Sequence, residues 1–183
     1  MQPSILALDL EGTLISNAVS QIPRPGLYPF LVAVRERFER LVIYTTVPEP
    51  AFRKIASLLV AEGSAPDWFA HLPYVAWSGA TKDLSNISTS LGQALLLDDH
   101  QAYVHPGQEE YRIEVELFGA PYKPSDCGLA AALYQTKKRL DAPIGQGIGM
   151  PETGVGRHRT DTPPCHTGRP TTPDQHIRHP DHA

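Results

Sequence analysis

Residues 5–16, ILALDLEGTLIS, decide the fold. An apolar run over 5–8 leads into an acidic residue, and a second acidic residue and a glycine follow closely. A short apolar run that ends in a glycine turn is typical of a buried β-strand. The stretch therefore predicts a strand that ends at the edge of the core with two carboxylates, those of Asp9 and Glu11, side by side.

Apolar strands and amphipathic helices alternate from this stretch to about residue 140. Apolar or β-branched runs predict strands over 41–46, 73–77, 93–99 and 111–118. Helical spacing of apolar residues predicts helices over 25–40, 49–63 and 125–140, with a helical turn region over 81–92. Strands and helices in this alternation predict an α/β fold with a mostly parallel central sheet.

Composition changes sharply near Leu140. Residues 141–183 are rich in Gly, Pro, Thr and His and contain almost no large apolar side chains. Such a segment buries too little apolar surface to offset the entropy lost on ordering. We therefore expect one domain over residues 1–140 and a disordered tail over 141–183, whose role the sequence leaves open.

The overall composition excludes several classes of partner. The chain has 41% hydrophobic and 20% charged residues and a formal net charge of -4. A mildly negative charge gives no support to nucleic-acid binding. No apolar stretch approaches the roughly 18 residues of a membrane helix, and the N-terminus lacks the basic region of a secretory signal. These features predict a cytoplasmic protein with no membrane partner.

Polar side chains follow several of the predicted strands. Asp9, Thr45 and Asp98 each end an apolar strand, and Asp99 follows directly. In parallel sheets such ends face one crevice. Clustered carboxylates repel one another unless a cation is present, and Mg²⁺ prefers oxygen ligands. With Lys82 nearby to hold an anion, the set suits phosphoryl transfer.

These motifs, in this order, resemble those of the haloacid dehalogenase-like (HAD) hydrolases. DLEGT at 9–13 is similar to their first motif, Asp-x-Asp-x-Thr, and LVIYTT at 41–46 to their second. Lys82 fits the third, and LLLDD at 95–99 resembles the fourth. The resemblance covers residues 5–120 and implies a Rossmann-like three-layer sandwich.

The resemblance implies a catalytic role for four residues. Asp9 would be the nucleophile, and Glu11 would take the place of the general acid and base. Thr45 would bind phosphoryl oxygens, although Thr46 next to it fits the spacing nearly as well. Lys82 would steady both the nucleophile and the phosphate.

The same resemblance implies a Mg²⁺ site. Asp9 would bind the ion through its carboxylate and Glu11 through its backbone carbonyl. Asp98 would complete the site, and Asp99 would bind directly or through water.

A closer resemblance links the chain to the small-capped HAD phosphatases related to the RNA polymerase C-terminal-domain phosphatases. TKDLSNIS at 81–88 and LLLDDHQAYVHPGQ at 95–108 carry this likeness. That branch usually shows Asp-Leu-Asp-Glu-Thr in its first motif, so DLEGT departs from it at two positions, Glu11 and Gly12. The enolase-phosphatases of the same superfamily show Asp-Ile-Glu-Gly-Thr, which is compatible with a phosphatase.

The expected function is Mg²⁺-dependent hydrolysis of a phosphate ester through an aspartyl-phosphate. The intervals between Asp9, Thr45 and Lys82 are too short for a substantial cap domain, so we expect an open site. Such a site favours a phosphorylated macromolecule, or a small substrate enclosed by oligomerisation. The alternative is a catalytically weak HAD-like binding or regulatory module. Substrate identity and oligomeric state stay open.

Overall fold

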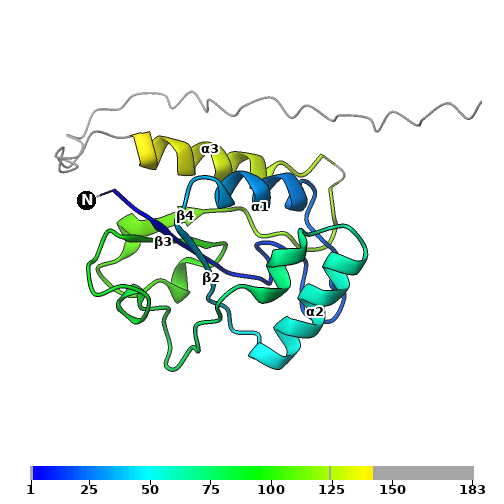
Figure 1. The fold of residues 1–183 in the computed structure, drawn as a ribbon, viewed down its shortest axis with the longest axis horizontal. Helices are drawn as coiled ribbons and strands as arrows, with labels where there is room; N and C mark the ends of the chain where they lie inside the picture. Colours follow the sequence, from blue (N-terminus) through cyan, green and yellow to red (C-terminus); the bar gives the residue numbers. More distant parts are fainter. Residues whose placement is uncertain (1, 124, 142–183) are drawn as a thin grey trace, which may run out of the picture.

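The computed structural model describes residues 2–123 and 125–141. Its strands are β1 (Ile5–Leu8), β2 (Arg40–Ile43), β3 (Ala94–Asp98) and β4 (Arg112–Glu114). Its α-helices are α1 (Leu27–Arg35), α2 (Glu49–Ala61) and α3 (Gly128–Asp141). The strands form one parallel sheet in the order β2-β1-β3-β4 (Figure 1). The predicted α/β fold with a parallel central sheet is confirmed.

The register of the sheet brings the strand ends level. Leu8, at the end of the central strand β1, pairs with Ile43 of β2 and with Leu97 of β3. Asp9 directly follows β1, and Asp98 is the last residue of β3. The parallel arrangement therefore delivers both carboxylates to the same edge of the sheet.

One face of the sheet is covered by the three α-helices, and we call it the helical face. Successive side chains of a strand point to opposite faces, so alternate residues of each strand belong to it. The strand residues buried there are Leu6, Leu8, Leu41, Ile43, Leu95, Leu97 and Ile113. Each helix turns an apolar stripe toward them, as Phe30 of α1, Phe52 of α2 and Leu129 of α3 illustrate. In Figure 1, α1 and α3 lie side by side over the sheet.

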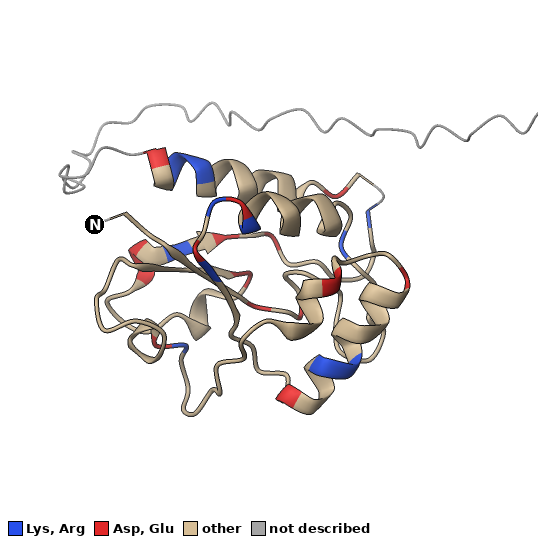
Figure 2. Ribbon diagram, viewed as in Figure 1, with Lys and Arg blue, Asp and Glu red and all other residues tan. Residues whose placement is uncertain are grey.

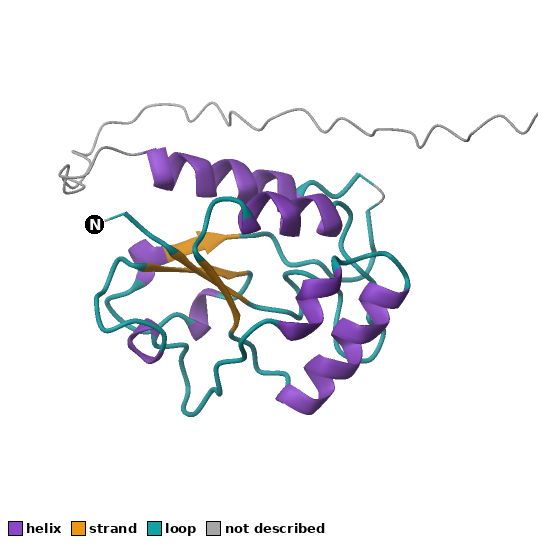
Figure 3. Ribbon diagram, viewed as in Figure 1, coloured by secondary structure: helices purple, strands orange, loops and turns teal. Residues whose placement is uncertain are grey.

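The opposite face is covered by loops and short 3-10 helices, and we call it the irregular face. Its strand residues are Ile5, Ala7, Val42, Ala94 and Leu96, and Tyr44 directly after β2 is buried with them. The segment over 75–87, with η2 (Leu84–Asn86), and the segment around η3 (Gln101–Tyr103) pack against them. Figure 3 shows these loops in teal across the sheet from α1 and α3. Two further 3-10 helices are η1 (Asp67–His71), which packs on α2, and η4 (Glu109–Tyr111).

The strand predicted over 73–77 is wrong. Only Tyr74 makes a bridge, in parallel to Ile43 at the outer edge of the sheet. Pro73 has no N–H to donate, and past Val75 the chain leaves the edge to pass across the irregular face. Val75 and Trp77 therefore belong to the chain that covers the irregular face, and not to a strand of the sheet.

Element lengths also differ from those predicted. The helix predicted over 25–40 ends at Arg35, and Phe38 turns into the core before β2 begins. The strand predicted over 111–118 is limited to β4. The tail expected over 141–183 lies outside the described residues, apart from Asp141 at the end of α3.

Of the described helices, none combines the length and the apolar character that crossing a membrane requires. In Figure 2, basic and acidic segments are both distributed over the described ribbon.

Candidate active site

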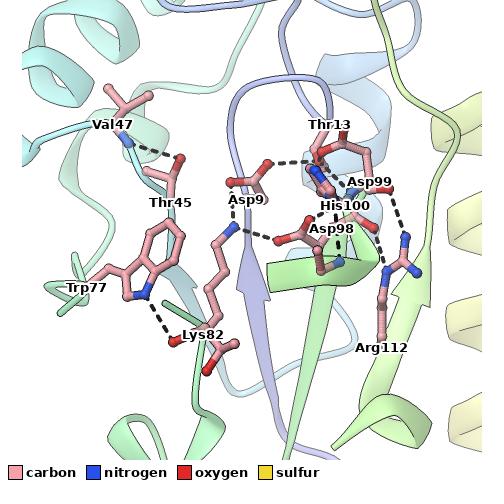
Figure 4. Close-up of polar contacts among 12 residues, drawn as sticks. Asp9, Thr13, Thr45, Val47, Trp77, Lys82, Asp98, Asp99, His100 and Arg112 are labelled. Atoms are coloured by element: carbon pink, nitrogen blue, oxygen red, sulfur yellow. Dashed lines mark hydrogen bonds and ion pairs between the residues drawn. The ribbon is translucent and has the colours of Figure 1, made fainter. Parts of the chain in front are cut away.

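Lys82 joins two of the predicted carboxylates at the strand ends. Its Nζ lies 2.7 Å from Asp9 Oδ1 and 2.5 Å from Asp98 Oδ2 (Figure 4). The three residues are buried, with exposures of 0% for Lys82, 4% for Asp9 and 0% for Asp98. Residues that are distant in the sequence thus form one buried ionic group.

The irregular face delivers Lys82 to this position. Its backbone N–H donates to the carbonyl of Tyr103 at 2.6 Å, and it forms a parallel bridge with Val104. The rings of Trp77 and Tyr103 each lie 5.8 Å from Nζ. The ammonium group therefore sits between carboxylates on one side and aromatic rings on the other, with little access for water.

Asp99 is linked to Asp9 through Thr13. The Thr13 Oγ1 atom lies 3.0 Å from Asp9 Oδ2 and 3.0 Å from Asp99 Oδ1, and it accepts from the backbone N–H of Asp99 at 3.2 Å. A hydroxyl has one proton, so it serves one carboxylate at a time. Thr13 was not among the predicted site residues, although it is the last residue of the DLEGT motif.

Gly12 lets these two loops approach each other. It has a φ of 72°, and a Cβ atom placed on it would lie 2.6 Å from Asp99 Oδ2. Any other residue would meet both the strained backbone and the Asp99 carboxylate. The glycine of DLEGT is therefore required by the close packing of Asp99 on this turn.

Burial and crowding shift the protonation of the group. Burial, the largest effect, raises the pKa of Asp9; the charge of Lys82 opposes that rise, and the charge of Asp98 adds to it. Burial by itself would lower the pKa of Lys82, but Asp9 and Asp98 outweigh it, and the pKa of Lys82 is raised. The pKa of Asp99 is raised by burial and then by the charge of Asp9. The single ammonium group of Lys82 therefore cannot balance the charges of three ionised carboxylates.

The donor set fits a divalent cation. Among the residues that the structure describes, Asp9, Asp98 and Asp99 each offer an oxygen, and these oxygens lie within 4.8 Å of one another. Three carboxylates and one ammonium have a formal charge of -3 + 1 = -2. A hard divalent ion such as Mg²⁺ would supply both the missing charge and a centre for oxygen ligands.

Glu11 lies apart from this cluster of carboxylates. Its Oε1 accepts from the backbone N–H of Ala18 at 2.5 Å, and its side chain is half-buried. The side chain therefore reaches toward the loop that follows the motif. Its role as acid and base, and that of its carbonyl as a metal ligand, stay predictions.

Thr45 is fully buried, whereas Thr46 is exposed. The Thr45 Oγ1 accepts from the backbone N–H of Val47 at 3.4 Å. In the view of Figure 4, Thr45 and Trp77 lie on one side of Asp9, and Asp98 and Asp99 lie on the other. Thr45 is thus the threonine of this pair that faces the interior, and its role as a phosphate ligand stays a prediction.

Residues 4–143 match the family model of the NLI interacting factor-like phosphatases. The chain belongs to this family. It is a HAD-like family related to the C-terminal-domain phosphatases, so the resemblance seen in the four motifs is confirmed and the protein is a HAD-type phosphatase. The matched range, residues 4–143, includes all the predicted site residues.

No curated protein matches the sequence. Among solved structures, one crystal structure aligns with 75% of this chain and 83% of its own chain, at 14% identity and a TM-score of 0.45. A likeness this weak adds nothing to the family assignment.

Proposed function

We propose that the phosphatase hydrolyses phosphate monoesters with Mg²⁺ and forms an aspartyl-phosphate on Asp9. The buried contact of Lys82 with Asp9 and Asp98 carries the proposal. It places a cation against a nucleophilic oxygen at an edge where further carboxylates converge. Phosphoryl transfer depends mainly on such positioning and charge neutralisation.

In the first step a carboxylate oxygen of Asp9 bonds to phosphorus, and the bond from phosphorus to the ester oxygen breaks. Glu11 gives a proton to the departing oxygen. In the second step Glu11 takes a proton from water, the water oxygen bonds to phosphorus, and inorganic phosphate leaves as Asp9 is restored. Because Ala18 holds Oε1 of Glu11, we assign the transferred proton to Oε2.

The remaining residues would hold the phosphate and the metal. Lys82 and the buried hydroxyl of Thr45 would bind phosphoryl oxygens. Asp9, Asp98 and Asp99 would hold Mg²⁺, together with the backbone carbonyl of Glu11. Bound Mg²⁺ would neutralise charge on the phosphoryl group. Thr13 would keep Asp99 and Asp9 at a constant separation.

The substrate class follows from the short connections around the site. We propose a phosphorylated macromolecule, because the described intervals between β1, β2 and Lys82 contain α1, α2 and η1 but no separate cap domain. A cytoplasmic location and the domain boundary at residue 140 remain predictions from the sequence.

One observation favours the alternative of a catalytically weak family member. The Glu11 carboxylate is engaged by Ala18 and lies apart from the cluster of carboxylates. A general acid that could not leave this contact would slow both steps. Turnover rates therefore decide between the two candidates.

The test is hydrolysis of p-nitrophenyl phosphate with and without Mg²⁺. We expect metal-dependent turnover by the unmodified protein and none above buffer for Asp9→Asn. The matched control is Asp67→Asn, an exposed acid at the start of η1, which should keep full activity. Full activity in Asp9→Asn would exclude Asp9 as the nucleophile. Absence of turnover in an unmodified protein that still binds Mg²⁺ would support the weak alternative.

A further inference from the structure

Arg24 is a buried arginine that packs against the DLEGT turn. Its Nε and Nη2 donate to Oδ1 and Oδ2 of Asp126 at 2.7 and 3.0 Å. Its Nη1 donates to the carbonyls of Thr13 at 3.2 Å and Gly12 at 3.4 Å. The guanidinium also lies 5.3 Å from the Phe118 ring. Arg24 therefore connects the turn to the segment that precedes α3.

The surroundings are shaped to hold this guanidinium. A Cβ atom placed on Gly128, the first residue of α3, would lie 1.9 Å from Nη2 of Arg24. The backbone N–H of Gly128 donates to the same Asp126 carboxylate at 3.1 Å. Phe118 donates its backbone N–H to the Gly12 carbonyl at 2.7 Å. The start of α3 thus leaves space for the arginine, and the Gly12 carbonyl is bound from two directions.

Arg112 makes the same kind of contact with the backbone at Asp98 and Asp99. We call this segment and the DLEGT turn at 9–13 the two acidic loops. From the start of β4, Arg112 donates through Nε to the carbonyl of Asp98 at 3.0 Å and through Nη2 to that of Asp99 at 2.8 Å (Figure 4). Its side chain is 8% exposed. Each acidic loop therefore has two consecutive carbonyls held by one guanidinium.

We propose that Arg24 and Arg112 are positioning residues that set the separation of the acidic loops for Mg²⁺. The inference rests on the proposed function. The arginines bind backbone carbonyls and leave the carboxylates of Asp9, Asp98 and Asp99 available. Arg24 acts on the metal site through the backbone of the DLEGT turn, and Arg112 acts through the backbone of Asp98 and Asp99.

Arginine suits this role because its planar fork presents several N–H groups in a rigid geometry, whereas a lysine offers one compact ammonium. Residues that support metal ligands typically change metal affinity or activity by about 10- to 100-fold when replaced. Lysine at either position keeps the charge but cannot reproduce the paired contacts. The substitution therefore separates geometry from charge.

The experiment is calorimetric titration of the full chain with Mg²⁺, for the unmodified protein and for Arg24→Lys and Arg112→Lys. We expect each variant to bind Mg²⁺ at least about tenfold more weakly. The Mg²⁺ concentration for half-maximal hydrolysis of p-nitrophenyl phosphate should rise equally, while KM for that ester at saturating Mg²⁺ stays constant.

The matched control is Arg53→Lys. Arg53 also donates through Nη1 to two carbonyls, those of Ala70 and Leu72, at 2.9 and 2.8 Å, and it pairs with Glu49. It joins α2 to the end of η1, away from the two acidic loops. The Mg²⁺ affinity of the Arg53→Lys variant should equal that of the unmodified protein.

Unchanged Mg²⁺ affinity in Arg112→Lys, or an equal loss in Arg53→Lys, would overturn the proposal. If Arg24→Lys fails to fold, Asp126→Asn tests the same contact, because it keeps the guanidinium and weakens its anchor; unchanged affinity there would also count against the proposal. An unmodified protein that binds no Mg²⁺ would overturn the proposed function, and this inference with it.

Discussion

The two faces of the sheet are built differently and contribute different things. On the helical face, α1, α2 and α3 satisfy their backbone groups internally and add apolar stripes to the core. On the irregular face, the covering chain has only short 3-10 turns, and it carries Lys82 and Trp77. The comparison shows that the helices on the helical face supply packing, whereas the chain on the irregular face supplies Lys82, the cation of the site.

Side chains replace regular backbone bonding on the irregular face. Buried Gln108 accepts from the backbone N–H of Leu84 at 2.8 Å and donates to Asp83 at 2.7 Å. Tyr44 donates its hydroxyl to the carbonyl of Asp83 at 3.2 Å, and the Trp77 indole N–H donates to that of Thr81 at 3.0 Å. These bonds flank Lys82 on both sides along the chain and fix its approach to the carboxylates.

The largest expected effect is that of Lys82→Met on the irregular face. The substitution leaves Asp9 and Asp98 buried without their cation, and breaking a buried ion pair in this way costs about 3–5 kcal/mol. We expect this loss in the free energy of unfolding by urea at pH 7, with loss of phosphatase activity. The deficit should shrink at lower pH, where a carboxyl can take up a proton.

The double variant Asp9→Asn with Lys82→Met is the control. It removes one charge of each sign, so its stability should exceed that of Lys82→Met alone. A double variant no more stable than the single one would mean that Lys82 stabilises the irregular face by packing, and the contrast between the faces would weaken.

A matched pair of leucines in β3 tests the difference in packing. Leu97 is buried on the helical face and Leu96 on the irregular face, with exposures of 0% and 1%. Replacing either by alanine should cost about 2–5 kcal/mol, with the larger loss where the surroundings relax least. We expect Leu97→Ala near the upper end and Leu96→Ala near the lower, measured by urea unfolding. Equal losses would show that the irregular face packs as rigidly as the helical one.

The smallest effect is a pH dependence of stabilisation by Mg²⁺. The raised pKa values of Asp9 and Asp99 mean that the folded metal-free protein retains protons that the unfolded chain has lost above the usual 3.8. Their contribution to stability therefore falls as pH rises from about 3.8 through the raised values. Mg²⁺ competes with those protons, so its stabilising effect should grow over the same interval.

Thermal unfolding at several pH values, with and without Mg²⁺, checks this expectation. At a Mg²⁺ concentration tenfold above Kd the gain should be about 1.4 kcal/mol. Asp99→Asn should reduce the gain at every pH, whereas Asp67→Asn should not change it. A gain that is independent of pH would show that proton release from the aspartates is not coupled to the metal.

Much of the helical face could be predicted from sequence patterns. The apolar run before Asp9 and the one before Asp98 became β1 and β3, and the spacing of apolar residues located α2 closely. The wrong strand over 73–77 belongs to the irregular face. There, apolar residues serve a covering segment whose path depends on side-chain contacts, and local periodicity carries no information on such a path.

The acidic residues of the site follow from the same patterns, because the ends of parallel strands must meet at one edge. Strand-end position alone is therefore enough to predict that Asp9 and Asp98 lie together. Lys82 was found through its motif, and the structure explains its place by the contacts with Tyr103 and Val104. Thr13 had the same kind of signal, as the last residue of the DLEGT motif, but it was not used. Arg24 and Arg112 had none, because one arginine in a sequence does not show what it will bind.

The sequence by itself determined that a parallel sheet forms, that Asp9 and Asp98 lie at the ends of two of its strands, and the family to which the chain belongs. These features depend on local apolar periodicity and on short motifs, both of which are written along the chain. The tertiary structure alone decided that Lys82 bridges Asp9 and Asp98, that Thr13 links Asp9 to Asp99, and that two arginines hold the loops from behind. Such contacts join residues far apart in the chain, and burial and hydrogen bonding select them only once the fold has brought the partners together.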